Sequence, residues 1–278
     1  MSDKYAVIGH PIGHSMSPFI HKRLFGLSGK DFEYSSADIA PEDLDSSIPR
    51  LSRLSGFNIT IPHKEAMMKY LADTDDSAKR YGAVNCVKCE NGRMSGCSTD
   101  AYGFKKALLG GGVRLLGNVL VLGCGGAART LAREAADSGC TVTIAARSRS
   151  LAKADALAEW INSSGGKALT APMDNIKGSF DLLINATPVG MYPNTDASPV
   201  GVELLSRCGA LFDAIYNPGV TRLMESARSL GVKTVGGMPM LVWQAVAAHE
   251  FWYGASFDDR DIENLISDAE KETKVIFG

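Results

Sequence analysis

The sequence has no long hydrophobic run and almost no net charge. None of its apolar stretches approaches the roughly 20 residues that a bilayer-spanning helix needs, and no Lys/Arg-rich amphipathic segment marks a membrane-surface protein. A formal net charge of −2 over 278 residues does not provide the basic surface that nucleic acid requires. We therefore expect neither a membrane partner nor a nucleic-acid partner.

Cysteine and metal-site spacings are scarce as well. The chain has six cysteines, and Cys86 and Cys89 form a C-x-x-C pair inside a predicted hairpin, but no second pair or His partner completes a zinc set. The histidines at 10, 14, 21, 63 and 249 show no zinc-type spacing, so we predict no metal site and expect them to be structural; for His10 and His14, lining a ligand site is the alternative. The N-terminus MSDKYAVIG has no signal-peptide pattern, and we expect reduced thiols in a cytoplasmic protein.

Strand and helix patterns alternate through the first hundred residues. Strands are predicted at 5–9, 31–39 and 56–61, and helices after Pro18, at 41–51 and at 63–72. Segments 83–88 and 93–98 pair as a hairpin around the turn Glu-Asn-Gly. This pattern predicts an α/β unit that lacks the features of a dinucleotide fold.

The glycine cluster at 110–112 marks a predicted boundary, after which the alternation becomes regular. Strands are predicted at 118–122, 141–147, 180–188, 210–216 and 233–237, and helices at 126–138, 151–163 and 221–231. Such alternation is typical of a Rossmann-like, doubly wound parallel sheet. From Pro239 onward the sequence reads as helical.

A glycine motif opens the second half of the chain. Residues Gly123 to Ala128 fit G-x-G-x-x-[GA] directly after a strand and at the start of a helix, a context in which backbone N–H groups bind a pyrophosphate. The alternative is a tight turn without a ligand. The next strand ends in Ala146-Arg147-Ser148-Arg149, without the acidic residue that binds the ribose of NAD. A guanidinium can instead hold a 2′-phosphate, so we predict NADP; solvated surface arginines are the alternative.

The first hundred residues carry polar side chains at positions where apolar ones would be expected. They are Ser15, Ser17, Asn58, Thr60, Lys64, Asn85, Thr99 and Asp100. Hydroxyls, amides, one carboxylate and one ammonium suit a polyol that bears a carboxylate. Each has a simpler alternative: Ser17 as a helix N-cap, Asn85 as a turn residue, and Lys64 as a surface charge at a helix start.

Eight stretches, in order, give the chain a resemblance to the shikimate dehydrogenase family over nearly its full length. They are GHPIGHSMSPFIH, FNITIPHK, GAVN, STDAYGF, GCGGAART, NATPVGM, DAIYNP and MPMLVWQA. The resemblance implies a substrate domain at 1–104, with C-terminal helices 239–278 packing back on it, and an NADP domain at 105–238, with the reaction in the cleft between them. It implies reversible, NADP-dependent reduction of 3-dehydroshikimate to shikimate in chorismate and aromatic amino-acid biosynthesis. Monomer and homodimer both stay open.

Carried over residue by residue, the resemblance also implies a site. Lys64 and Asp100 would be the catalytic pair, and Ser15 and Ser17 would contact the substrate carboxylate. The ring hydroxyls would contact Thr60, Asn85, Asp100, Tyr216 and Gln244. The cofactor would contact Gly123, Cys124, Gly125, Gly126, Ala127, Ala128, Ala146, Arg147, Ser148, Ala214 and Gly237, with Asp76 as a weaker candidate.

The chain departs from the family pattern next to these positions. It has Ala146-Arg147-Ser148 where the family commonly reads Asn-Arg-Thr, which predicts weaker NADP binding, and Ser98 and Cys86 replace Asn and Thr beside the substrate site. A quinate/shikimate dehydrogenase using NAD or NADP is therefore an alternative. A non-catalytic nucleotide or shikimate sensor is the alternative of another class, although it would not need a proton-transfer pair.

Overall fold

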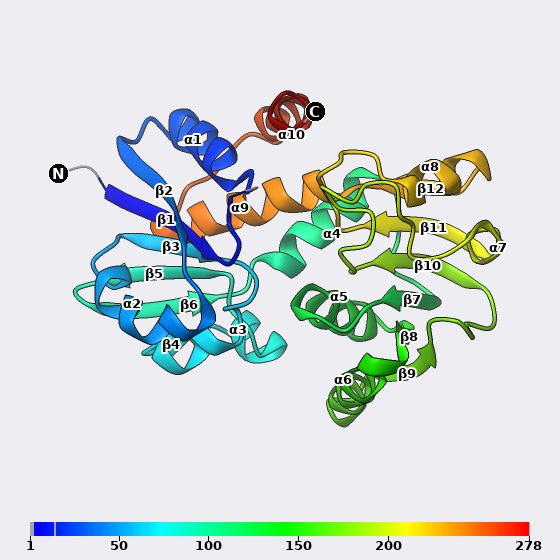
Figure 1. Ribbon diagram of the computed structural model, residues 1–278. Coiled ribbons are helices and arrows are strands. Elements are labelled where there is room, and N and C mark those ends of the chain that lie inside the picture. Colours follow the sequence, from blue (N-terminus) through cyan, green and yellow to red (C-terminus); the bar gives the residue numbers. More distant parts are fainter. Residues whose placement is uncertain (1–2, 14, 278) are drawn as a thin grey trace. The chain divides into compact units, whose positions relative to one another are not determined.

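The computed structural model describes residues 3–13 and 15–277, and these form two compact units (Figure 1). The first unit comprises Met1–Gly103 and Leu241–Ala269, and the second comprises Phe104–Met240 and Glu270–Gly278. Helices α4 (Asp100–Gly110), α9 (Gly237–Tyr253) and α10 (Asp259–Phe277) each have residues in both units. Within the described part of the chain, none of the helices has the length and apolar character needed to cross a membrane.

The first unit is built on a mixed sheet with the strand order β2-β1-β3-β5-β6-β4. Its strands are β1 Asp3–Gly9, β2 Phe32–Asp38, β3 Gly56–Ile59, β4 Asp73–Thr74, β5 Cys86–Glu90 and β6 Arg93–Cys97. Strand β5 runs antiparallel to both β3 and β6, and the other pairs are parallel. The hairpin register pairs Cys86 with Cys97, so the residues just outside the hairpin, Asn85 and Ser98, face each other.

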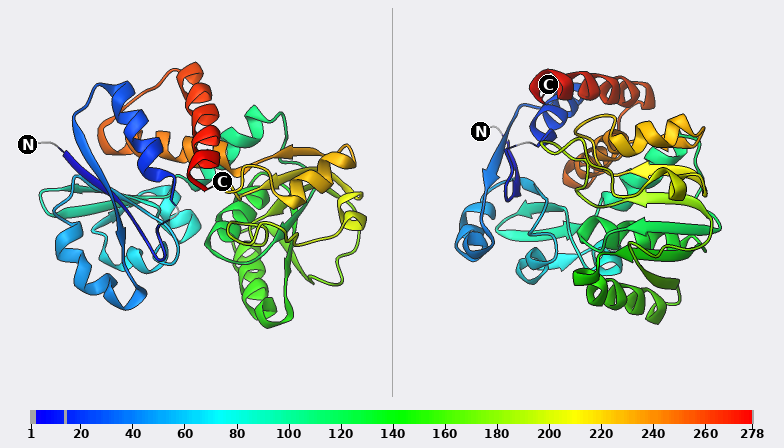
Figure 2. Two further views of the ribbon diagram at one scale, coloured as in Figure 1. Left: turned by 45° about the horizontal axis from the view of Figure 1, so that its top comes forward. Right: turned by 45° about the vertical axis from the view of Figure 1, so that its right-hand side comes forward.

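Helices cover both faces of this sheet. One face packs against α2 (Leu44–Leu51), the short 3-10 helix η2 (Ala66–Tyr70) and α3 (Asp76–Tyr81), and a 3-10 turn η1 (Pro41–Asp43) leads into α2. The other face packs against α1 (Ser17–Ser28) and the end of α9, where Phe25 and Trp252 lie with Tyr5. Figure 2 shows α10 beside α1, where Arg23 contacts Asp268 at 2.8 Å.

The second unit is a parallel, doubly wound sheet with the strand order β12-β11-β10-β7-β8-β9. The strands are β7 Asn118–Leu122, β8 Thr141–Ala146, β9 Lys167–Pro172, β10 Phe180–Asn185, β11 Cys208–Asp213 and β12 Lys233–Val235. One face buries α4, α5 (Gly126–Asp137) and α6 (Leu151–Ser163), and the other buries α7 (Val202–Leu205) and α8 (Arg222–Ser229). A further 3-10 turn, η3 (Ser148–Ser150), precedes α6. The predicted α/β class with a doubly wound parallel sheet is confirmed.

One predicted helix is wrong. Segment 63–72 forms only η2: the carbonyl of Lys64 accepts Val84 N at 3.0 Å, and Met68 N, which an α-helix would direct to Lys64 O, donates to Glu65 O at 3.2 Å instead. The chain then turns toward β6, where Ala72 N donates to Met94 O at 2.9 Å. Strand β9 was not predicted, since its alternation is weak and glycines precede it.

Candidate active site

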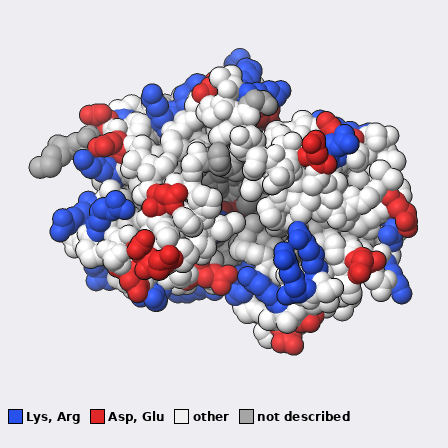
Figure 3. All heavy atoms as spheres, in the orientation of Figure 1, with Lys and Arg blue, Asp and Glu red and all other residues white. Residues whose placement is uncertain are grey.

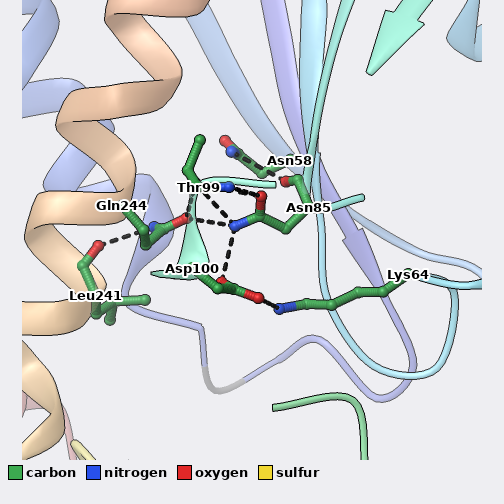
Figure 4. Close-up of polar contacts among 7 residues, drawn as sticks. All are labelled: Asn58, Lys64, Asn85, Thr99, Asp100, Leu241 and Gln244. Carbon is green, nitrogen blue, oxygen red and sulfur yellow. Dashed lines mark hydrogen bonds and ion pairs between the residues drawn. The ribbon is translucent and has the colours of Figure 1, made fainter. Parts of the chain in front are cut away.

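An ion pair lies at the centre of the polar group in the first unit. Lys64 follows β3 and Asp100 is the first residue of α4, a position where a carboxylate is favoured by the helix dipole. Lys64 Nζ lies 2.5 Å from Asp100 Oδ2, and the two side chains are 16% and 8% exposed (Figure 4). The contact is a charge-assisted hydrogen bond. An ammonium has three donors, and among the described residues Asp100 takes one of those of Lys64.

Asn85 holds the other oxygen of that carboxylate. Its Nδ2 donates to Asp100 Oδ1 at 2.9 Å and to Thr99 Oγ1 at 2.9 Å, while its Oδ1 accepts Thr99 N at 2.7 Å. Both oxygens of Asp100 are therefore engaged, one by an amide and one by an ammonium. Such two-sided contact fixes the plane of the carboxylate and aims Oδ2 at Lys64.

Gln244 reaches the same group from α9. Its Oε1 lies 3.2 Å from Asn85 Nδ2 and 3.4 Å from Thr99 Oγ1, and its Nε2 donates to Leu241 O at 2.8 Å (Figure 4). The structure thus brings together four of the residues that the sequence singled out: Lys64, Asn85, Asp100 and Gln244. Three of them are buried, and Lys64 is half-buried.

Asn58 extends the network away from the ion pair. It is 4% exposed, its Nδ2 lies 3.4 Å from Asn85 O, and its Oδ1 accepts the Tyr34 hydroxyl at 2.8 Å. Burial raises the pKa of Tyr34 well above its usual value, so this hydroxyl stays a donor. Tyr34 is a member of the group that sequence analysis missed; its position in the alternating strand 31–39 was the available signal.

The serine pair lies where α1 begins. Met16 is the N-cap residue, and Ser15 Oγ accepts Ser17 N at 3.2 Å, so the predicted alternative of Ser17 as the N-cap does not hold. A helix N-terminus presents N–H groups that favour an anion. Thr60 is half-buried just beyond β3, where its N donates to Ile8 O at 2.9 Å.

The described histidines all have nearby partners in the first unit. His10 Nδ1 lies 2.6 Å from Asp38 Oδ1, and His63 Nε2 lies 2.7 Å from Ile39 O. His21 and His249 contact each other; His14 lies outside the described residues. Asp76, the weaker cofactor candidate, is exposed in the first turn of α3.

The glycine turn in the second unit follows β7. Gly123 has φ +101°, and a Cβ added there would lie 3.1 Å from Ala186 O and from the methyl group of Thr187. Gly125 is the N-cap residue of α5, and a Cβ added at Gly125 or Gly126 would meet nothing within 4 Å. The open space in front of the helix N-terminus fits the close approach of a pyrophosphate.

The turn after β8 contributes the basic part of this surface. Ala146 is buried, whereas Arg147, Ser148 and Arg149 are exposed. Cys124 Sγ lies 3.7 Å from Ser150 O, so the glycine turn and the arginine turn are neighbours. Figure 3 shows Lys and Arg side chains gathered where Figure 1 draws α5, β8 and α6. Two guanidinium groups without a carboxylate in the turn fit a 2′-phosphate, and thus NADP.

Ala214 and Gly237 also lie together in the second unit. Gly237 N donates to Ile215 O at 3.1 Å, and a Cβ on Gly237 would lie within van der Waals overlap of Ala214 O. Tyr216 follows in the same loop and is half-buried. These residues belong to the second unit and the Lys64 group to the first.

The family model for the shikimate dehydrogenase substrate binding domain matches residues 7–87. A protein named shikimate dehydrogenase (NADP(+)) from Shouchella clausii is 35% identical over 96% of this chain and 98% of its own. The Thermus thermophilus shikimate 5-dehydrogenase, solved with NADP(H) and shikimate, is 37% identical with a TM-score of 0.86, over 96% of this chain and 99% of that one.

A relative with a different name has the same fold. The 5-ketofructose reductase of a Gluconobacter strain is 31% identical to this chain, with a TM-score of 0.81 over 96% of this chain and 99% of that one. Fold alone therefore leaves the substrate to be argued from side chains.

Proposed function

The chain belongs to the shikimate dehydrogenase family, and on that premise we propose that it catalyses the reversible, NADP-dependent reduction of 3-dehydroshikimate to shikimate. The observation that carries the proposal is the contact of Lys64 with Asp100 at 2.5 Å, with Asn85 on the opposite carboxylate oxygen. A ketone reductase needs a proton donor at the carbonyl oxygen, and an ammonium oriented by a carboxylate can supply it, whereas ligand binding alone does not require a proton-transfer pair.

The reaction requires a proton donor that acts together with hydride transfer. NADPH supplies the hydride to the keto carbon, and negative charge develops on the former carbonyl oxygen. Lys64 is proposed to stabilise that oxygen and to donate the proton, with a typical contribution of about 10²–10⁴-fold for such catalysis. Asp100 orients Lys64 through Oδ2; in the reverse direction the lysine accepts the proton of the substrate hydroxyl.

The remaining polar residues are proposed to bind substrate. Ser15 and Ser17, at the N-terminus of α1, contact the carboxylate, because hydroxyl and N–H donors suit an anion there. The ring hydroxyls contact Thr60, Asn85, Asp100 and Gln244 of the first unit and Tyr216 of the second. We propose a substrate domain at 1–104 with 239–278 and an NADP domain at 105–238; the two compact units differ from this division mainly at Glu270–Gly278, which belongs to the second unit.

The cofactor residues are proposed on the fit described above. Residues 123–128 bind the pyrophosphate, Arg147 with Ala146 and Ser148 binds the adenosine 2′-phosphate, and Ala214 and Gly237 line the nicotinamide side. Asp76 is the weakest member of the set, because it is exposed and belongs to the first unit.

We further propose a place for the protein in aromatic amino-acid biosynthesis in the cytoplasm, where its six free cysteines stay reduced. Monomer and homodimer are distinguished by light scattering, against a chain mass of 29.6 kDa.

The deciding experiment follows absorbance of reduced nicotinamide with purified protein. Shikimate and quinate are each supplied with NADP+ or NAD+, and 5-ketofructose, a ketone that would be reduced, is supplied with NADPH or NADH. Turnover confined to shikimate and NADP supports the proposal. Turnover with quinate or NAD moves the assignment to the broader quinate/shikimate dehydrogenase, and ligand binding without any turnover supports a sensor.

A further inference from the structure

A fully buried carboxylate joins two loops of the second unit. Asp213, the last residue of β11, accepts Asn185 Nδ2 at 2.9 Å and Ile215 N at 3.1 Å on Oδ1, and Thr221 Oγ1 at 2.6 Å on Oδ2. Burial raises the pKa of this carboxyl, and the three hydrogen bonds oppose that rise. Nothing in the reaction proposed above uses this group, so its cost of burial needs another reason.

The hydrogen bonds continue from Asn185 into the loop after β10. Asn185 Oδ1 accepts Thr187 N at 3.1 Å and Thr187 Oγ1 at 2.7 Å, and Thr187 Oγ1 accepts Val189 N at 3.3 Å. On the other side, Thr221 Oγ1 caps α8 by accepting Met224 N at 3.2 Å. Asp213 and Asn185 thus hold the backbone after two adjacent strands in one arrangement.

Both loops lie against glycines of the proposed cofactor surface. The loop after β10 faces Gly123 through Ala186 O and the Thr187 methyl group, where an added Cβ would lie at 3.1 Å. The loop after β11 faces Gly237, whose N donates to Ile215 O at 3.1 Å. The position of each loop therefore sets the space beside the glycine turn and beside the start of α9.

In a sheet with this strand order, each half binds one mononucleotide. The half formed by β7, β8 and β9 carries the glycine and arginine turns, which suit the adenosine 2′-phosphate half of NADP. The half formed by β10, β11 and β12 carries the Asp213–Asn185 pair. Ligands bind at the carboxyl ends of such strands, which is where both residues lie.

We propose that Asp213 is a positioning residue for the nicotinamide half of NADP, acting through Asn185 and the backbone of the loops after β10 and β11. The proposal rests on the proposed use of NADP. It assigns no contact between Asp213 and the cofactor; the carboxylate keeps the two loops in the arrangement that the nicotinamide half requires.

The test compares the binding of whole NADP+ with the binding of its adenosine half alone. Calorimetry measures binding of NADP+ and of adenosine 2′,5′-bisphosphate, which lacks the nicotinamide half, to wild type and to Asp213→Ala. We expect the dissociation constant for NADP+ to rise about tenfold, equivalent to the loss of one to two hydrogen bonds, while that for the bisphosphate stays within about twofold.

Three further variants make the result specific. In Asp213→Asn, the remaining side-chain oxygen can still accept Asn185 Nδ2 and Ile215 N, and the amide can donate to the Thr221 hydroxyl. This variant should therefore bind NADP+ more tightly than Asp213→Ala, with a dissociation constant close to that of wild type. Asp181→Ala is the matched control, since Asp181 accepts Asn118 N at 2.7 Å at the other end of the sheet, and both ligands should bind it alike. If Asp213→Ala does not fold, Thr221→Val removes one donor and should weaken NADP+ alone by about threefold.

An equal loss of both ligands in Asp213→Ala or Thr221→Val, or no loss of either, overturns the positioning role. A wild-type protein that binds the bisphosphate but not NADP+, or neither, overturns the proposed use of NADP itself. The two failures are therefore distinguishable in the same titrations.

Discussion

Asn85 donates to Oδ1 of Asp100 at 2.9 Å, on the carboxylate oxygen opposite the one that Lys64 contacts. The carboxylate is therefore oriented before any ligand arrives. An arrangement of this kind reduces the reorganisation needed during reaction, which is the main way that fixed dipoles assist catalysis.

The proton-donor role predicts a loss confined to the chemical step when Lys64 is changed to Ala. We expect kcat to fall by roughly 10²–10⁴-fold, with the dissociation constant for shikimate changed only a few-fold. Lys69→Ala is the matched control, because Lys69 is an exposed lysine of η2 whose Nζ lies 3.3 Å from Asp45. A similar kcat loss in both variants would contradict a specific role for Lys64.

Changing Asn85 to Asp tests the orientation of Asp100 at nearly constant shape. The new carboxylate still accepts Thr99 N, but it faces Asp100 Oδ1 with a like charge. Two adjacent carboxylates raise the pKa of one of them. We expect kcat/KM for shikimate to fall at least about tenfold at pH 7 and to recover partly toward low pH. A pH profile parallel to that of wild type would show that Asn85 does not control Asp100.

The contact of Asn85 with Asp100 could be predicted from the sequence pattern, whereas the contribution of Gln244 could not. The contact of Asn85 with Thr99 and Asp100 follows from the hairpin register, because Cys86 pairs with Cys97 and sets Asn85 opposite the residues after β6. Both hairpin strands were predicted. Gln244 reaches the group from 144 positions beyond Asp100 in sequence, so only the family resemblance pointed to it.

The predicted elements are also wrong where contacts between residues far apart in sequence override the local pattern. The segment after Pro62 has helical periodicity, but Lys64 O bonds to Val84 N, and such a long-range competitor is invisible in local pattern. Asn185 and Asp213 end β10 and β11 in the structure, whereas the predicted strands 180–188 and 210–216 continue past them; a polar residue inside each apolar run was the available signal for the strand end. Strand β7, buried on both faces, was predicted because a continuous apolar run into glycines is typical of a parallel strand.

A buried histidine pair predicts how stability depends on pH. His21 Nδ1 lies 2.9 Å from His249 Nε2, and both rings are fully buried in the first unit. Burial lowers the pKa of His249 to about 3 and that of His21 well below its usual range. The unfolded chain binds protons at these residues near pH 6.5, so the free energy of unfolding is unaffected above that pH and falls as pH drops toward 3.

Urea unfolding between pH 7.5 and about pH 4.5 measures this effect. Each histidine contributes a slope of up to about 1.4 kcal/mol per pH unit in the acidic range. The double variant His21→Phe with His249→Phe should show a shallower slope. Tyr253→Phe removes the hydroxyl beside His249 Nδ1 but keeps both imidazoles, so it should retain the wild-type slope. Equal slopes in wild type and the double variant would rule out the pair as the cause.

Arg147 predicts the preference between the two dinucleotides. It is exposed after β8, in a turn without a carboxylate, and the only chemical difference between the cofactors is the 2′-phosphate. Arg147→Ala should raise KM for NADP by about tenfold and leave KM for NAD within about twofold, because one charge-assisted contact is lost. Lys153→Ala, at an exposed position on α6, is the control and should change neither constant.

Substitutions at two glycines of the second unit are expected to have different effects, one on NADP+ binding and the other on stability. A Cβ on Gly125 would meet nothing within 4 Å, whereas one on Gly237 would overlap Ala214 O. Gly125→Ala should therefore keep the melting temperature within a few degrees but weaken NADP+ binding, because the methyl group occupies the space that a pyrophosphate needs beside α5. Gly237→Ala should lower the melting temperature, since a backbone oxygen cannot move aside as a flexible side chain can.

Thermal unfolding with and without NADP+ measures the stability of each variant and its binding of the cofactor. A clear drop in the melting temperature of Gly125→Ala without cofactor would contradict this, because it would mean that the chain itself needs the space at the start of α5. The glycine turn would then have a structural role.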